Sequence, residues 1–271
     1  MSFDQRDMSN YDGKPIFLFE LLYGNKTRYY CNVDRDITIN GSTYIGSNFG
    51  HNGITQSGDA QSDSVTVDCP ADIDIVKQWQ GTPPTDQIFL TIREMHYGDT
   101  EADVGWIGTV SDVRRPTPAT AQIVGQTLSM SFKRGGLRLS YTRSCPHFIY
   151  DVNCGVNPDS FAVNCVVTAV GGDWFEADAI ATTAGGWFNG GFVKFEREDG
   201  AWERYGCESS SGKRIVLMNA ADRLVTGMSV IAYPGCARIS SVCKFKFNND
   251  LRYGGFSGMP GRSPFDGNPV F

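Results

Sequence analysis

The chain has 271 residues, of which 41% are hydrophobic and 12% aromatic, so it can bury one or two apolar cores and is not disordered as a whole. Its 24 Lys and Arg residues stand against 30 Asp and Glu residues, which gives a net charge of -6. A protein held to nucleic acid by neutralising phosphates needs the opposite sign, so sequence-specific nucleic-acid binding is not expected.

The first residues, 1–7, lack the apolar stretch of an export signal. No window of the sequence approaches the ~18 apolar residues of a membrane-spanning helix. We therefore expect a protein that is made in the cytoplasm and is not inserted into a membrane. Thiols stay reduced in that compartment, so the 8 cysteines favour metal ligation or burial over disulfides.

Residues 1–138 are predicted to form the first of two β modules. Asn40-Gly41 lies between two short alternating stretches, residues 37–39 and 42–45, and both turn residues readily adopt positive φ, which predicts a two-residue type I′ hairpin. One short helix is predicted at residues 72–79, with Asp72 as its capping residue. The other expected strands cover residues 16–23, 27–33, 64–68, 87–95, 104–113 and 121–132.

Residues 139–271 are predicted to form the second module. The alternation lapses over residues 133–160, which places the domain boundary between residues 138 and 139. Residues 234–271 are rich in Gly, Pro and Asn and show almost no periodicity, so either something other than a β ladder orders them or they remain a tail. Strands are expected at residues 161–170, 174–180, 192–198, 201–205, 213–218 and 228–233. The fold class is therefore mainly β: two small β-barrel or sandwich modules with one short helix and an irregular C-terminal region that holds cysteines.

Four cysteines bracket the second module. Cys145 and Cys154 precede it with eight residues between them, and Cys236 and Cys243 follow it with six between them. If the ends of the module meet, four thiolates converge, which is the ligand set of tetrahedral zinc or of an iron–sulfur cluster. Structural zinc sites usually leave two to four residues between paired cysteines, whereas a [4Fe–4S] cluster spreads its ligand positions and tolerates longer loops. The spacing favours the cluster and leaves zinc, buried thiols and oxidised pairs as alternatives.

The other candidate ligands have plainer explanations. His147 lies two residues from Cys145 and could complete a Cys/His zinc site, but a hydrogen-bonding role in a loop is the simpler interpretation. The remaining cysteines lie in or beside predicted strands, where a small buried thiol is the expected role, with Cys207 the strongest of them as a further ligand. They are Cys31, Cys69, Cys165 and Cys207.

Three stretches of the second half carry a family resemblance. They are Ser-Cys-Pro-His-Phe-Ile-Tyr-Asp-Val-Asn-Cys-Gly-Val at residues 144–156, Tyr-Pro-Gly-Cys at residues 233–236, and residues 247–261, which contain Phe-Asn-Asn, Arg-Tyr-Gly-Gly-Phe and Met-Pro-Gly. From residue 144 onward the chain resembles the C-terminal domain of siphophage tail-tip hub proteins, a family that also occurs in gene transfer agents and has a more distant relative in tail-tip protein L of phage lambda. The resemblance implies a [4Fe–4S] cluster held by Cys145, Cys154, Cys236 and Cys243.

The resemblance also implies a structural role at the tip of a long non-contractile bacteriophage tail. There, a homotrimeric ring of hub proteins joins the distal tail protein ring to the central fibre protein, and its lumen passes DNA during ejection. The acidic composition leads us to expect a lumen that repels DNA. Such a hub is made in the host cytoplasm and carried at the tail tip of the virion, where the cluster ties two loops together.

Two other functional classes remain open from the sequence. One is an iron–sulfur protein for electron transfer or redox sensing, which would need a reductase partner. The other is a zinc-dependent tail hydrolase, which is weakened because no open metal site with an adjacent base is evident. The sequence contains no P-loop, no G-x-S-x-G and no H-E-x-x-H motif, so we expect no enzymatic activity.

Overall fold

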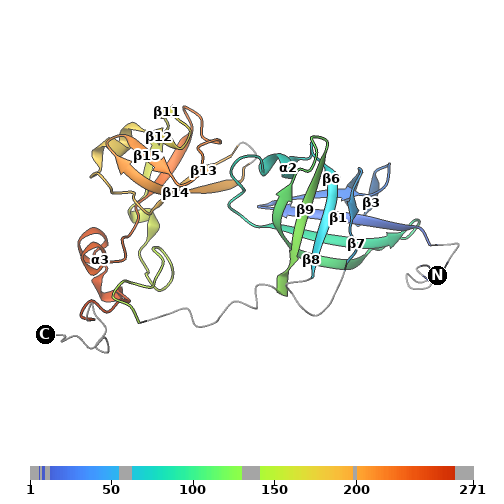
Figure 1. Cartoon of the computed structure of the whole chain (residues 1–271), viewed down its shortest axis with the longest axis horizontal. Helices are drawn as coiled ribbons and strands as arrows, with labels where there is room; N and C mark the ends of the chain where they lie inside the picture. The colour runs from blue at the N-terminus through green and yellow to red at the C-terminus, as the bar shows by residue number, and fades with distance from the viewer. Residues whose placement is uncertain are drawn as a thin grey trace. The chain divides into compact units, whose positions relative to one another are not determined.

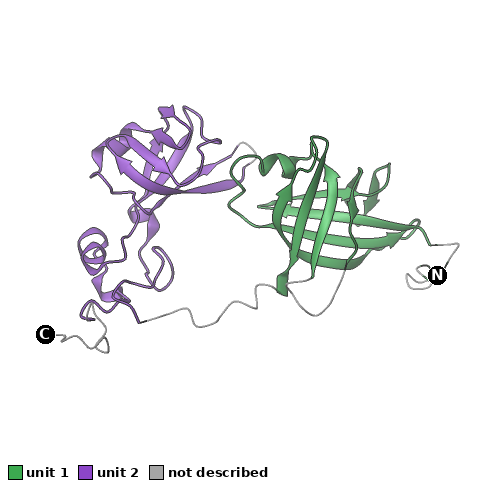
Figure 2. Ribbon diagram, viewed as in Figure 1, with its two compact units in different colours: residues 1–134 green, residues 135–271 purple. Residues whose placement is uncertain are grey.

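The computed structural model describes residue 6, residues 8–9, and residues 13–54, 63–129, 141–197 and 200–259. The chain forms two compact units, residues 1–134 and residues 135–271 (Figure 1 and Figure 2). The predicted boundary between residues 138 and 139 lies outside the described residues. The predicted fold class is confirmed, since each unit is built on a sheet and helices are few within the described ranges.

In the described part of the first unit, nine strands form a sheet in the order β3-β4-β2-β1-β7-β8-β9-β6-β5, which curls into half a barrel (Figure 1). Its alternation is clearest in β6, where Val65, Val67 and Cys69 are buried and Ser64 and Asp68 are exposed. The strands are β1 (Pro15–Tyr23), β2 (Lys26–Cys31), β3 (Ile37–Ile39), β4 (Ser42–Gly46), β5 (Gly50–His51), β6 (Ser64–Pro70), β7 (Ile88–His96), β8 (Asp103–Arg114) and β9 (Thr120–Thr127).

The hairpin predicted at Asn40-Gly41 is confirmed. Ile39 pairs with Ser42 across the turn, and the two turn residues have φ values of 49° and 80°. Both lie in the left-handed region, as a type I′ turn requires, and Asn and Gly adopt it at low cost.

The predicted helix at residues 72–79 is also present, but it is shorter and is capped differently. Helix α2 (Asp74–Gln78) begins after Ile73, which makes no side-chain capping bond, so the prediction that Asp72 caps it was wrong. Ile75 and Val76 are almost completely buried. Burial of these two side chains, and not a cap, stabilises this single turn.

Seven strands of the second unit form the other sheet in the described ranges, in the order β10-β16-β13-β14-β15-β12-β11. We call residues 163–233 the β module. Its core contains the fully buried rings of Phe175, Phe188 and Phe195. The 3-10 helix η2 (Pro158–Ser160) precedes the module, whose elements are β10 (Val163–Val166), β11 (Ala169–Val170), β12 (Trp174–Glu176), η3 (Asp178–Thr182), β13 (Phe192–Glu196), β14 (Trp202–Ser211), β15 (Arg214–Leu217) and β16 (Ser229–Tyr233).

Two predicted strands of this module are interrupted. The strand expected over residues 161–170 divides into β10 and β11, because the Val167 amide turns to donate to the Met228 carbonyl (2.9 Å). The strand expected over residues 174–180 ends at Glu176 and continues as the 3-10 helix η3, which buries Ile180. The break at residues 171–173 joins β11 to β12 as predicted.

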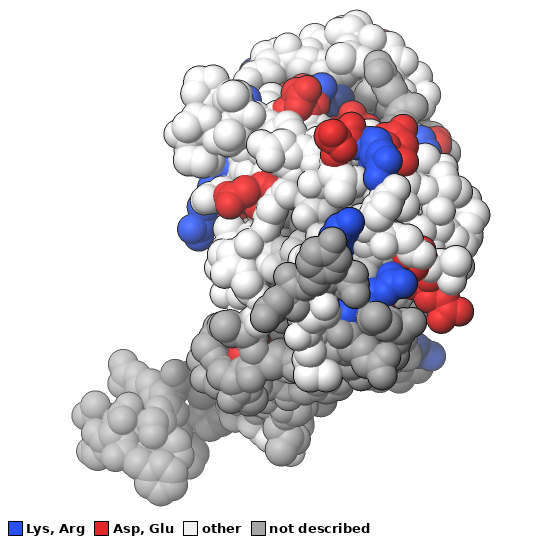
Figure 3. All heavy atoms as spheres, turned by 90° about the vertical axis from the view of Figure 1, so that its right-hand side faces the viewer, with Lys and Arg blue, Asp and Glu red and all other residues white. Residues whose placement is uncertain are grey.

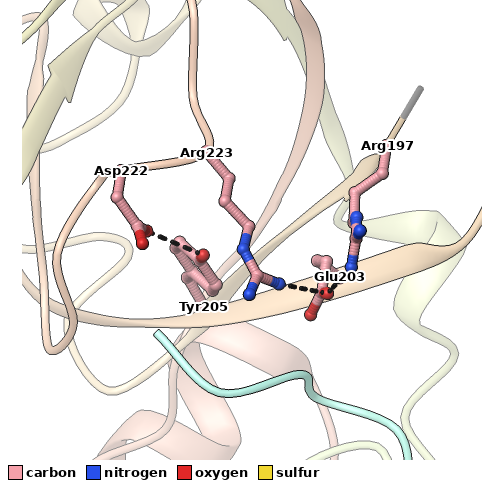
Figure 4. Close-up of polar contacts among 5 residues, drawn as sticks. All are labelled: Arg197, Glu203, Tyr205, Asp222 and Arg223. Carbon is pink, nitrogen blue, oxygen red and sulfur yellow. Dashed lines mark hydrogen bonds and ion pairs between the residues drawn. The ribbon is translucent and has the colours of Figure 1, made fainter. Parts of the chain in front are cut away.

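A charged network is buried in the β module. The fully buried Glu203 of β14 accepts hydrogen bonds from Arg197 Nη1 (3.1 Å) and Arg223 Nη1 (2.6 Å), while Tyr205 donates to Asp222 Oδ1 (3.2 Å) (Figure 4). Two guanidinium groups on one carboxylate offset the cost of removing it from water. The network ties the β13–β14 hairpin to the segment before β16.

Residues 234–259 are more regular than the sequence predicts. Helix α3 (Ser240–Phe247), which lies below the labelled strands of this unit in Figure 1, is followed by the 3-10 helix η4 (Asp250–Arg252). The helix buries only Cys243 and Phe247, whereas Phe245 is 83% exposed. It therefore lacks the apolar stripe by which a surface helix is recognised.

In the part of the chain that the structure describes, no helix is both long and apolar enough to cross a bilayer. Figure 3 shows a face on which basic and acidic side chains are interspersed among uncharged ones.

Candidate metal centre

The four candidate ligands lie in two segments that meet beside the β module. We call these segments, residues 141–161 and 234–259, the cysteine lobe. Val163 at the start of β10 pairs with Ala232 near the end of β16, in an antiparallel ladder. The chain before β10, which carries Cys145 and Cys154, therefore enters the module next to the point where the chain leaves it toward Cys236.

Backbone contacts through Arg238 join Cys145 to Cys236. The amide of Cys145 donates to the Arg238 carbonyl (2.9 Å), and the amide of Arg238 donates to Cys236 Sγ (3.4 Å). The Tyr253 hydroxyl also donates to the Arg238 carbonyl (3.3 Å) and to the Arg143 carbonyl (2.6 Å). One cysteine from each segment is thus fixed at the same short stretch of backbone.

Contacts through Asn249 join Cys154 to Cys243 in the same way. Asn249 Nδ2 donates to the Cys154 carbonyl (2.8 Å) and lies 3.9 Å from Cys154 Sγ. The Cys243 thiol donates to the Asn249 carbonyl (3.1 Å). This second link again pairs one cysteine of the first segment with one of the second.

The Cys243 thiol is influenced electrostatically by the other three cysteines. Burial raises the pKa of Cys243, and the neighbouring Cys236, Cys145 and Cys154 raise it further, to about 11. Thiolates that share a site repel one another, so they ionise together only if a positive group offsets their charge. The structure therefore brings the four predicted residues into one neighbourhood.

The Cys236 segment is held against the β module by close backbone packing. A Cβ on Gly235 would lie 2.0 Å from the Asn189 carbonyl oxygen, and a Cβ on Gly191 would lie 2.1 Å from the Tyr233 carbonyl oxygen. Only glycine fits at either position. The Tyr150 hydroxyl donates to the Pro234 carbonyl (2.7 Å), which ties the loop before Cys154 to the same segment.

The donor chemistry of this site suits an iron–sulfur cluster. All eight cysteines lie within the described residues and are free, and cysteine thiolates are the usual ligands of such clusters. Across the described ranges, no group of three or more His, Cys, Asp or Glu side chains is arranged to hold a metal ion. The ligand assignment of Cys145, Cys154, Cys236 and Cys243 therefore stays a prediction.

His147, the alternative ligand, is packed tightly against a glycine. A Cβ on Gly254 would lie 2.3 Å from His147 Nε2, and His147 Nδ1 is buried without a hydrogen-bond partner among the described residues. The structure places this ring in the cysteine lobe and assigns it no ligand role.

The other four cysteines lie buried in the two β cores, as expected. Burial raises the pKa of Cys69 and Cys207 to about 12 and that of Cys165 to about 11. Cys31 and Cys207 are completely buried, and Cys207 belongs to the core of the β module and not to the cysteine lobe. Protonated thiols in apolar cores are packing residues.

Several residues of this site were not identified from the sequence. Asn249, Tyr150 and Tyr253 join the two segments through contacts with backbone or sulfur atoms. Asn249 and Tyr253 fall in the Phe-Asn-Asn and Arg-Tyr-Gly-Gly-Phe stretches that carry the family resemblance, which was a signal that they matter.

Comparisons with known proteins relate the chain to phage and virion proteins. A family model described as "Phage conserved hypothetical protein BR0599" matches residues 186–263, a range that includes Cys236 and Cys243. A protein of Xylella fastidiosa (strain 9a5c), named only "Uncharacterized protein", is 28% identical over 126 residues, which are 42% of this chain and 26% of that protein. The chain thus spans about a quarter of the length of that relative.

The fold is shared with a solved virion structure. A chain of the "Virion of native gene transfer agent (GTA) particle" matches with a TM-score of 0.80 and 17% sequence identity, over 100% of this chain and 99% of that one. At this identity the match establishes a common fold. The chain thus has the fold of a protein from a gene transfer agent virion and, over residues 186–263, the sequence pattern of a phage protein family.

Proposed function

We propose that this chain is a structural hub protein at the distal tip of a long non-contractile phage-type tail. Three copies form a ring that joins the distal tail protein ring to the central fibre protein, and DNA passes through the lumen. The match over the whole chain to a gene transfer agent virion protein, together with the phage family match, supports a virion role. The tail-tip position and the trimer rest on the resemblance described from the sequence.

The observation that carries the proposal is a pair of contacts between the two segments, through Arg238 for Cys145 and Cys236 and through Asn249 for Cys154 and Cys243, all four of them free cysteines. We propose that Cys145, Cys154, Cys236 and Cys243 hold a [4Fe–4S] cluster. The sulfur ligands of a cluster surround a group of iron and sulfide, so they need not converge on a single point as those of a zinc site do. When bound, the cluster supplies a cross-link between the two segments and adds its binding energy to folding.

Metal and sulfide analysis tests the cluster. Full-length protein purified without oxygen is expected to be brown and to contain close to four iron and four sulfide per chain. One tightly bound zinc per chain in a colourless protein would contradict the cluster and leave the virion role untouched.

A reconstruction of the intact tail tip tests the hub assignment. Three copies are expected around the tail axis, as the family resemblance implies. A six-fold ring, or absence of the protein from virions, would overturn the assignment.

One observation favours a second candidate function, an electron-transfer or redox-sensing iron–sulfur protein. Cys145, Cys154 and Cys236 are partly exposed, which would leave a cluster within reach of a redox partner. Reversible reduction of the cluster with an unchanged fold, in a protein that does not co-sediment with virions, would favour this function over the hub.

A further inference from the structure

A lysine of α3 joins the two cysteine-bearing elements of the second segment. Lys246 lies three residues after Cys243, and its Nζ donates to the carbonyl of Gly235 (2.8 Å), the residue before Cys236. The same Nζ donates to the Trp187 carbonyl (2.5 Å) in the β module. One ammonium group therefore connects the helix of Cys243, the loop of Cys236 and the module beneath them.

The surroundings of Lys246 are unusual for a lysine on a surface helix. Such side chains normally extend their ammonium groups into water. Here the side chain is half-buried, and Nζ lies 4.5 Å from the centre of the Trp187 ring and 5.3 Å from that of Phe247. Two carbonyl acceptors and two aromatic faces replace much of its water, a combination that a compact cation with three N–H donors satisfies.

The positive charge of Lys246 also affects the electrostatics of the proposed cluster site. Thiolate ligands make an iron–sulfur site negative. Burial lowers the pKa of Lys246, and the neighbouring Cys236 opposes that shift. A fixed cation beside the site opposes that negative charge, and net charge near a cluster is one of the factors that set its reduction potential.

We propose that Lys246 is a positioning residue for the cysteine set: it fixes the Cys236 loop against the Cys243 helix and places a positive charge beside them. This inference rests on the proposed cluster. It concerns a side chain that touches carbonyl oxygens and not the metal, so its loss should weaken the site without removing a ligand.

The test compares Lys246→Met with Lys244→Met in the full-length protein purified without oxygen. Lys244 lies on the same helix and is exposed, so its variant controls for loss of a lysine from α3. We expect iron to be released to a chelator about tenfold faster from Lys246→Met, the lower end of the range for lost outer-shell partners of metal sites. We also expect a lower reduction potential, because removing a cation disfavours the added electron.

The outcomes separate this inference from the proposed function. A wild-type protein without iron and sulfide would contradict the cluster itself. The role of Lys246 alone would be overturned if the wild-type protein holds a full cluster and Lys246→Met matches Lys244→Met in both its rate of iron release and its reduction potential.

A second variant covers the case in which Lys246→Met is insoluble. Lys246→Gln keeps an N–H donor on a similar chain and removes the charge. We expect Lys246→Gln to have a lower reduction potential and faster iron release than Lys244→Met. If the two variants are equal in both measurements, the proposal is overturned.

Discussion

The β module and the cysteine lobe are parts of the same unit, yet they are held together in different ways. The module has a continuous ladder of strands around a core in which Phe175, Phe188 and Phe195 are fully buried. In the lobe, Leu251 is 97% exposed and Val152 is 93% exposed. Burial of apolar surface orders the module, whereas directed contacts such as those of Asn249 and Tyr253 hold the two segments of the lobe together. The proposed cluster would add a cross-link there, so damage to the lobe should act through the bound iron and damage to the module through its unfolding free energy.

The largest expected effect comes from removing one thiol of the lobe. Serine in place of Cys145, Cys154, Cys236 or Cys243 should give protein that lacks iron and aggregates or fails to enter tails, because each change removes one of four ligands. Iron per chain and incorporation into virions are the measurements.

The matched control is Cys207→Ser, at a fully buried cysteine of the module. It should keep its full iron and lose about 1–3 kcal/mol of unfolding free energy, because a hydroxyl replaces a thiol in an apolar core. Loss of iron in Cys207→Ser, with iron retained in one of the four lobe variants, would show that the ligands are assigned wrongly.

Breaking the buried charged network should give the largest effect in the module. Glu203→Ala leaves Arg197 and Arg223 without their shared carboxylate, and should lower the unfolding free energy by about 3–5 kcal/mol. Denaturant titration of the full-length protein measures the change. Glu208→Ala, at an exposed position of the same strand, should stay within about 0.5 kcal/mol of the wild type, and equal losses in the two variants would refute the role of the network.

A methyl group at Gly235 tests the junction between module and lobe. Gly235→Ala places a Cβ 2.0 Å from the Asn189 carbonyl oxygen, so the Cys236 segment must move away from the module. We expect a loss of about 1–3 kcal/mol together with faster iron release.

The control for this junction is Gly172→Ala, at a glycine of the module with open space around its added Cβ. It should change neither unfolding nor iron release. An unfolding free energy of Gly235→Ala equal to that of Gly172→Ala would show that the backbone packing at Gly235 is loose.

The smallest expected effect comes from one hydroxyl of the lobe. Tyr150→Phe removes the hydrogen bond to the Pro234 carbonyl and keeps the ring contacts with Phe192 and Phe247, so the cost should be about 1 kcal/mol. Thermal unfolding followed by circular dichroism measures it. Tyr141→Phe, at a residue that is 74% exposed, should leave the transition unchanged, and a larger shift in this variant than in Tyr150→Phe would contradict the assignment.

The same comparison explains what the sequence could predict. The strands of both units were recognisable because apolar residues alternate with polar ones, and Asn40-Gly41 carries its turn geometry in two residues. The positions of the four lobe cysteines, on either side of the module, predicted that they would meet. Each of these features is local or follows from the order of the elements.

The features that were missed depend on residues far apart in the chain or lack a periodic pattern. Helix α3 exposes Phe245 and buries few apolar side chains, so its sequence lacks the periodic apolar pattern from which a surface helix is predicted. The contact from Lys246 to Trp187 spans 59 residues, and it exists only after the β module has folded. The ion pair of Glu203 with Arg223 likewise depends on the segment before β16 folding back onto β14.

The attachment of the lobe to β10 and β16 has a mechanical consequence. Because β10 starts where β16 ends, a pull on the lobe draws both strands in the same direction and leaves the ladder between them unstrained. The force passes instead to the ladder of β16 with β13, which runs from Tyr233 and Phe192 to Val230 and Phe195. The hydrogen bonds between β16 and β13 lie across the line of force and are loaded together in shear. The lobe is therefore anchored to an interior strand of the sheet, whose hydrogen bonds resist tension together.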